Sequence, residues 1–110
     1  MSVNWGNVRN QVAQAVEQVV GAGWPNAAAG ASTQFAAIIA AGHLIEQNRN
    51  SMKQAEYDSL KLIQQRALEG VLQAYEGISL DAAQQAAAAA WNVVAGAIKI
   101  AYPALGLILV

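Results

Sequence analysis

The stretch AAQQAAAAAWNVVAGAIKIAYPALGLILV, residues 82–110, decides the fold of this chain. These 29 residues carry one charge, Lys99, and end in an aliphatic run. A surface as apolar as this has to be covered by lipid, by a neighbouring copy or by the rest of the chain. Fold and function therefore both depend on how residues 82–110 are covered.

Alanine dominates the composition. Apolar residues make up 55% of the 110 residues, and 25 of them are Ala. Alanine is the best helix former and lets helices approach closely, although each buried Ala removes little area from water. A chain of this length forms a single domain. We therefore predict one all-α domain built from helix-on-helix contacts.

The charges divide the chain into an apolar, a charged and a second apolar third. The net charge is −1, and ten of the 13 charged residues lie between Glu46 and Asp81. This distribution leaves no basic patch for specific nucleic-acid recognition. The chain has no Cys, which excludes disulfides and thiol chemistry. Residues 1–9 lack a basic region followed by an apolar core, so we expect no secretory signal.

The first third predicts an amphipathic helix. Residues 2–20 repeat apolar residues at three- and four-residue steps, with Asn and Gln on the other side. Ser2 or Asn4 is the expected N-cap. The Gly- and Pro-containing stretch 21–26 breaks this helix.

Residues 27–76 predict one long helix or two. The part from 27 to 45 has no Asp, Glu, Lys or Arg and is long enough to span a membrane, but small residues at four-residue spacing favour close helix packing. The part from 46 to 76 is charged, with an expected apolar stripe of Met52, Leu60, Ile63, Ala67, Val71 and Tyr75, widened by Leu68 and Leu72. No Pro or Gly interrupts residues 43–69. A continuous rod would have about 50 residues and measure roughly 75 Å, which a small monomer cannot bury.

A turn at residues 77–79 reverses the chain. Gly77 suits the residue after a helix, and Ser79 followed by Asp81 suits the start of the next one. The Ala-rich helix 80–102 then returns along the rod as an antiparallel hairpin, and residues 103–110 continue as an apolar tail. Pro103 ends or kinks the returning helix.

The sequence holds no catalytic or metal-binding constellation. His43 is the only His, and with Glu46 one turn later it supplies two ligands where a metal site needs three or four. The remaining carboxylates do not pair on one helix face in a way that supports acid and base catalysis. We therefore expect no enzymatic activity, no cofactor, no metal and no small-molecule substrate.

The apolar C-terminal third allows two kinds of cover. As a helix, residues 86–110 measure about 37 Å and can cross an apolar layer of about 30 Å. Lys99 would then lie near the middle at a cost of about 2.5 to 3.5 kcal/mol, unless it faces an aqueous lumen or a partner helix. Alternatively, the tail packs against Val8, Val12 and Val16 of the first helix within an oligomer.

These considerations predict two sets of contact residues. The set expected to contact membrane or neighbouring subunits comprises Trp24, Phe35, Ile38, Ile39, Leu44, Ile45, Trp91, Val94, Ile98, Ile100, Tyr102, Leu105, Leu107 and Leu109. The polar set expected to line a lumen or an interface comprises Gln11, Gln14, Gln18 and Lys99.

One family shares the order of segments. The uncharged stretch GASTQFAAIIAAG, residues 30–42, runs into the charged stretch EQNRNSMKQAE, residues 46–56. Over residues 27–76 this order resembles the smallest internal virion protein, or ejection protein, of short-tailed bacteriophages. The resemblance implies storage in the capsid, exit through the tail ahead of the genome, and a homo-oligomeric channel in the host envelope. It implies that residues 27–45 contact membrane and that residues 46–76 extend the tube.

The first functional hypothesis is therefore a channel-forming or ejection-type virion protein that helps genome delivery. Each copy would consist of an amphipathic helix plus a long helical hairpin, and the copies would assemble as a homo-oligomeric ring or tube. Its expected partners are copies of itself, a lipid membrane and other virion proteins, and its expected location is the virion and then the host cell envelope. Two alternatives remain open. One is a holin-like small pore former, and the other is a soluble structural or adaptor oligomer with the tail buried between subunits.

Overall fold

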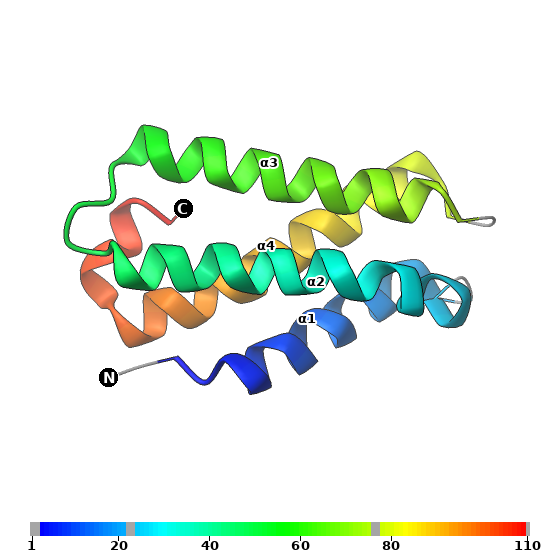
Figure 1. The fold of residues 1–110 in the computed structure, drawn as a ribbon, viewed down its shortest axis with the longest axis horizontal. Coiled ribbons are helices and arrows are strands. Elements are labelled where there is room, and N and C mark those ends of the chain that lie inside the picture. Colours follow the sequence, from blue (N-terminus) through cyan, green and yellow to red (C-terminus); the bar gives the residue numbers. More distant parts are fainter. Residues whose placement is uncertain (1–2, 22–23, 76–77, 110) are drawn as a thin grey trace.

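The chain forms a bundle of helices that run alternately in opposite directions (Figure 1). The computed structural model describes residues 3–21, 24–75 and 78–109, and the side chains of these residues except 24–30. Within these ranges the elements are α1 (Trp5–Val20), α2 (Trp24–Gln47), α3 (Gln54–Gln73), α4 (Leu80–Ala101) and the short 3₁₀-helix η2 (Pro103–Leu107). The predicted all-α class is confirmed.

The ends of α1 follow from local chemistry. Asn4 is the N-cap, because its side-chain oxygen accepts a hydrogen bond from the Asn7 backbone N–H at 3.2 Å. At the other end Gly21 adopts φ 64°, a left-handed conformation that glycine tolerates best. The predicted amphipathic pattern places Val8, Val12 and Val16 in the core.

Two alternatives were open for residues 27–76, one long helix or two, and the structure has two: α2 and α3 are separate helices joined by residues 48–53. Asn48 donates from its side chain to the Leu44 carbonyl at 2.9 Å, and Arg49 donates to the Glu46 carbonyl at 3.0 Å. These bonds satisfy carbonyls at the end of α2, and residues such as Asn and Ser favour turns by bonding to nearby backbone. The chain therefore folds back on itself, and the longest dimension of the molecule is 42 Å.

The first residues of α2 also differ from the expectation. The helix begins at Trp24, three residues before the predicted start, and includes Pro25 in its first turn. Proline is tolerated there because the first N–H groups of a helix have no intrahelical partner. The expected turn residue Gly77 lies outside the described residues.

α4 is the helix that every other element contacts. Figure 1 shows α4 crossing behind α2, with α3 above it and α1 below. Its buried face repeats at three- and four-residue steps and comprises Ala83, Ala86, Ala87, Ala90, Trp91, Val94, Ala95 and Ile98. Ser79 caps its start by accepting from the Ala82 N–H at 3.1 Å. The small residues let the neighbouring helices approach the axis of α4 closely.

One buried hydrogen bond ties α4 to α3. The indole Nε1–H of Trp91 donates to the hydroxyl of Tyr57 at 2.8 Å, and both residues are buried. The two rings lie 6.1 Å apart between centroids and are tilted by 52°. Burial raises the pKa of the Tyr57 phenol above its ordinary value, so the hydroxyl stays neutral. The bond satisfies the one polar group that Trp91 brings into the core.

The C-terminal tail folds back on its own chain. η2 packs against α4, and Leu105 and Leu109 are buried. The backbone carbonyl of Ile108 accepts a hydrogen bond from the side chain of Gln54 at the start of α3. Much of the cover that residues 82–110 require is therefore intramolecular.

The apolar stripe predicted for α3 is partly wrong. The residues of α3 that are buried are Tyr57, Leu68 and Leu72, whereas Ile63 is 62% exposed. The prediction assumed that one stripe faces one neighbour. In the structure α3 packs against both α2 and α4, so the buried face is rotated toward Leu68 and Leu72.

We expect the Trp91 and Tyr57 contributions to be strongly non-additive. Tyr57→Phe leaves the indole N–H buried without an acceptor and should lower the free energy of unfolding by about 1–3 kcal/mol. Trp91→Phe should cost at least as much, because it also removes ring volume. The double variant should cost less than the sum, since it leaves no indole N–H unpaired. Urea unfolding of the four proteins measures this coupling, and strictly additive losses would contradict the proposed role of the bond.

Candidate interaction surface

Most of the apolar residues predicted to contact membrane or subunits are in the core. The buried ones are Phe35, Ile38, Ile39, Ile45, Trp91, Val94, Ile98, Leu105 and Leu109. They pack within the chain itself, because the break after α2 brings the helices together. Leu44, Ile100 and Leu107 are exposed, and Tyr102 is half-buried. The side chain of Trp24 lies outside the described residues.

The predicted polar contact residues are all exposed. Gln14 and Gln18 lie on the outer side of α1, away from its buried valines, and Gln11 lines the groove between α1 and α4. Lys99 lies beside η2, where a Cβ added to Gly106 would stand 3.3 Å from its Cε. The ammonium group of Lys99 thus lies on the surface while its stem covers apolar tail.

The first candidate surface is a groove between α2 and α3, which we call the hairpin groove. It has a volume of about 630 Å³. Its lining residues are Leu44, Asn48, Met52, Ala55, Glu56, Ser59, Leu60 and Ile63. Leu44 from α2 is 46% exposed and Ile63 from α3 is 62% exposed, while Met52 is buried. The groove therefore combines an apolar lining with exposed aliphatic side chains, which is typical of a protein interface.

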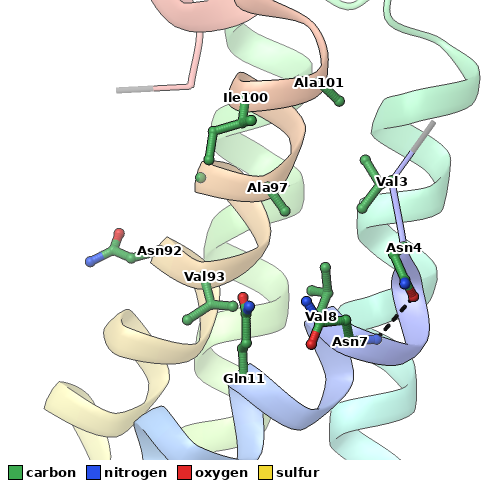
Figure 2. Close-up of a pocket in the computed structure, with 11 residues that line it drawn as sticks. Val3, Asn4, Asn7, Val8, Gln11, Asn92, Val93, Ala97, Ile100 and Ala101 are labelled. Carbon is green, nitrogen blue, oxygen red and sulfur yellow. Dashed lines mark hydrogen bonds between the residues drawn. The ribbon is translucent and has the colours of Figure 1, made fainter. Parts of the chain in front are cut away.

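The second candidate surface is a groove of about 400 Å³ between α1 and α4, which we call the amide groove. Figure 2 shows Asn7 and Gln11 on α1 and Asn92 on α4, with Val93, Ala97 and Ile100 along the same side of α4. None of its lining residues is charged. Ile100 is its most exposed large apolar residue, at 79%. The lining of this groove therefore combines uncharged hydrogen-bonding side chains with apolar side chains.

A polar cluster closes the end of the bundle near the N-terminus. Glu46, close to the end of α2, accepts hydrogen bonds from the indole N–H of Trp5 at 2.7 Å, from the Tyr102 hydroxyl at 2.9 Å and from the Val3 backbone N–H at 3.3 Å. The Trp5 ring also lies 4.3 Å from the His43 ring, measured between centroids. The cluster joins the start of α1 and the end of α4 to α2.

The hydrogen bonds shift the pKa values within this cluster. Partial burial opposes ionisation of Glu46, but the hydrogen bonds from Trp5, Tyr102 and Val3, together with the charge of His43, outweigh it and hold the pKa of this carboxyl below its ordinary value of 4.5. Desolvation and the bond to Glu46 raise the pKa of the Tyr102 phenol. At neutral pH the cluster is therefore an ionised carboxylate surrounded by neutral donors.

The described residues contain neither a metal site nor a spanning helix. Residues 3–21, 24–75 and 78–109 hold no group of three or more His, Cys, Asp or Glu that could bind a metal ion. In the same ranges no helix combines the length and the apolar character needed to cross a bilayer.

Comparison of the chain with models of known protein families, with curated proteins and with solved structures found no match.

Sequence reasoning did not single out Gly42, considered Glu46 as a metal ligand beside His43, and placed Ile63 on a packed helix face. The structure gives each of these residues a different role. Glu46 is the only carboxylate between Glu17 and Glu56, a signal that was present in the sequence. Gly42 shows no local signal, because its role is to admit the Trp5 ring from another helix. The exposure of Ile63 depends on how α3 is rotated, which local periodicity does not determine.

We expect Gly42→Ala to destabilise the protein by about 1–3 kcal/mol through overpacking. A Cβ at this position would stand 2.8 Å from Val94 and closer still to the Trp5 ring. The matched control is Gly70→Ala in α3, where no atom lies within 4 Å. That change should stabilise the protein by about 0.5–1 kcal/mol, because Ala is the better helix former. Urea unfolding compares the two, and a neutral Gly42→Ala would contradict the packing of Trp5 on α2.

Proposed function

We propose that the protein is a non-catalytic helical assembly subunit that binds further copies of itself through the hairpin groove. The observation that carries this proposal is the exposure of Leu44 and Ile63 beside a groove with an apolar lining. Covering apolar area contributes about 25 cal/mol per Å², so burial of these side chains by a second copy favours association.

The geometry suits a symmetric pair of copies. Most homo-oligomers use two-fold interfaces, in which each copy supplies the same patch to the other. Ile63 lines the groove and is 62% exposed, so a two-fold arrangement can bring the Ile63 side chain of each copy against the groove of the other. Asn48, Ser59 and Glu56 supply polar groups at the same groove, as expected at the rim of an interface.

The electrostatics favour association as well. A net charge of −1 on 110 residues gives two copies little mutual repulsion. Glu56 is the only charged residue among those that line the groove. Burial of the groove therefore desolvates few charges.

We expect Ile63→Lys to weaken self-association by at least about tenfold, which corresponds to about 1.4 kcal/mol. The substitution replaces an apolar contact with a charge that the partner groove would have to desolvate. Because Ile63 is mostly exposed in the isolated chain, helix content should not change. Sedimentation equilibrium over a range of concentrations measures the effect.

The control is Leu107→Lys, which alters an even more exposed residue, 89% accessible, outside the hairpin groove. It should leave the association constant unchanged. A wild-type protein that remains monomeric at all accessible concentrations would disprove the proposal, and equal weakening by both variants would exclude the hairpin groove as the interface.

A second candidate function is a membrane-contacting channel of the ejection type, acting in the virion and then in the host envelope. The observation that favours it is the low charge of two long helices. α2 contains one formally charged residue, Glu46, and α4 contains two, Asp81 and Lys99. Since these helices cover each other and are covered by α1 and α3, their separation would present long apolar faces to a bilayer. A holin-like protein shares this chemistry, and its absence from purified virions would separate the two.

For this second function we expect the purified protein to release dye from loaded liposomes. The release should grow with protein concentration in the range where copies associate. Liposomes that stay intact and bind no protein would eliminate the channel function and leave the assembly proposal standing.

A further inference from the structure

We infer that Glu46 is an acid-released latch that fastens the start of α1 and the end of α4 to α2. The inference is independent of the proposed assembly function. It rests on three hydrogen bonds that reach one carboxylate from residues 41, 43 and 56 positions away.

The latch joins three parts of the chain through two oxygens. Oε2 accepts from the Trp5 indole, and Oε1 accepts from both the Val3 backbone and the Tyr102 hydroxyl. The first described residues and the residue that ends α4 thus meet at one residue of α2. Figure 1 shows the end of α4 and the short helix η2 at the same end of the bundle as the end of α2.

Ionisation makes Glu46 a strong acceptor for all three bonds at once. A carboxylate accepts at both oxygens, whereas a protonated carboxyl carries a hydroxyl that acts as a donor. Trp5, Val3 and Tyr102 each present a donor to it. Protonation therefore weakens the set as a whole, and hydrogen bonds to charged groups are the stronger kind.

Several ionisable or polar groups surround Glu46, and Glu46 is the acceptor that they share. On α2, His43 stacks on Trp5 and its charge favours the carboxylate, while Arg49 is occupied elsewhere. The Arg49 side chain donates to the Glu46 backbone carbonyl and lies over the Tyr102 ring, 4.5 Å from its centroid. Tyr102 is the group that faces Glu46 from the end of α4, and Trp5, which faces it from α1, does not ionise.

The sign of the pH effect follows from the depressed pKa. A carboxyl whose pKa is lower in the folded state contributes its full stabilisation above its unfolded-state pKa, near 4.5. The contribution is lost as the pH falls through the folded-state pKa. The hydrogen bonds to Glu46 are therefore expected to form at neutral pH and to weaken in acid.

Release is expected to be local. Trp91 and Tyr57 hold α3 and α4 together through a buried bond that lies away from Glu46 and that acid does not protonate. The segments that lose an anchor are the first turn of α1 and the tail after Tyr102. Opening there would uncover Val8, which lines the amide groove.

Amide hydrogen exchange of the full chain between pH 3 and pH 7, corrected for intrinsic rates, tests the latch. In the wild type, protection of residues 5–10 and 102–109 should fall by about tenfold or more as the pH drops below 4.5, while the core of α4 keeps its protection. Glu46→Gln, which keeps the size but not the charge, should show the low protection already at pH 7 and little further change on acidification.

Two further variants make the result specific. Glu17→Gln, which changes an exposed carboxylate of α1 that lines neither groove, should behave as the wild type. Tyr102→Phe removes one donor and should loosen residues 102–109 while residues 5–10 stay protected by the Trp5 bond. A uniform loss of protection across all helices at low pH, or an undiminished transition in Glu46→Gln, would overturn the inference.

Discussion

Burial of the alanine-rich face of α4 is the constraint on which the rest of the structure depends. α1, α2, α3 and η2 all pack against this helix. Because alanine supplies little area per residue, its advantage is close approach, and the larger Trp91 fills the space between the helices. The indole N–H then requires a buried acceptor, which Tyr57 of α3 provides. The packing around α4 therefore combines close helix contacts at its alanines with one buried aromatic pair.

This use of the apolar residues changes the functional argument. An uncovered C-terminal third would have pointed to lipid, but Ile98, Leu105 and Leu109 are buried within the chain. Among the described residues, the exposed large apolar side chains include Leu44 and Ile63 at the hairpin groove and Ile100 at the amide groove. Exposed apolar side chains beside a groove favour contact with another protein chain over insertion into a bilayer.

Two sets of polar interactions join different parts of the molecule, one in the core and one at the end of the bundle near Glu46. The Trp91 to Tyr57 bond is buried and joins two neutral groups, so pH in the acid range leaves it intact. The bonds to Glu46 are partly buried and depend on a charge. A single carboxylate outside the core thus bonds residues at the start of α1 and at the end of α4.

The sequence by itself determined the helical class, the amphipathic first helix with its buried valines, and the capped return helix that begins at Leu80. These features depend on interactions between residues within a few positions of each other, such as the Ser79 cap and the apolar spacing of α1. The separation of α2 from α3, the exposure of Ile63 and the meeting of Trp5, Glu46 and Tyr102 were decided only by the tertiary structure. The physical reason is that folding back at residues 48–53 gains burial against α4, and local periodicity carries no information about that distant helix.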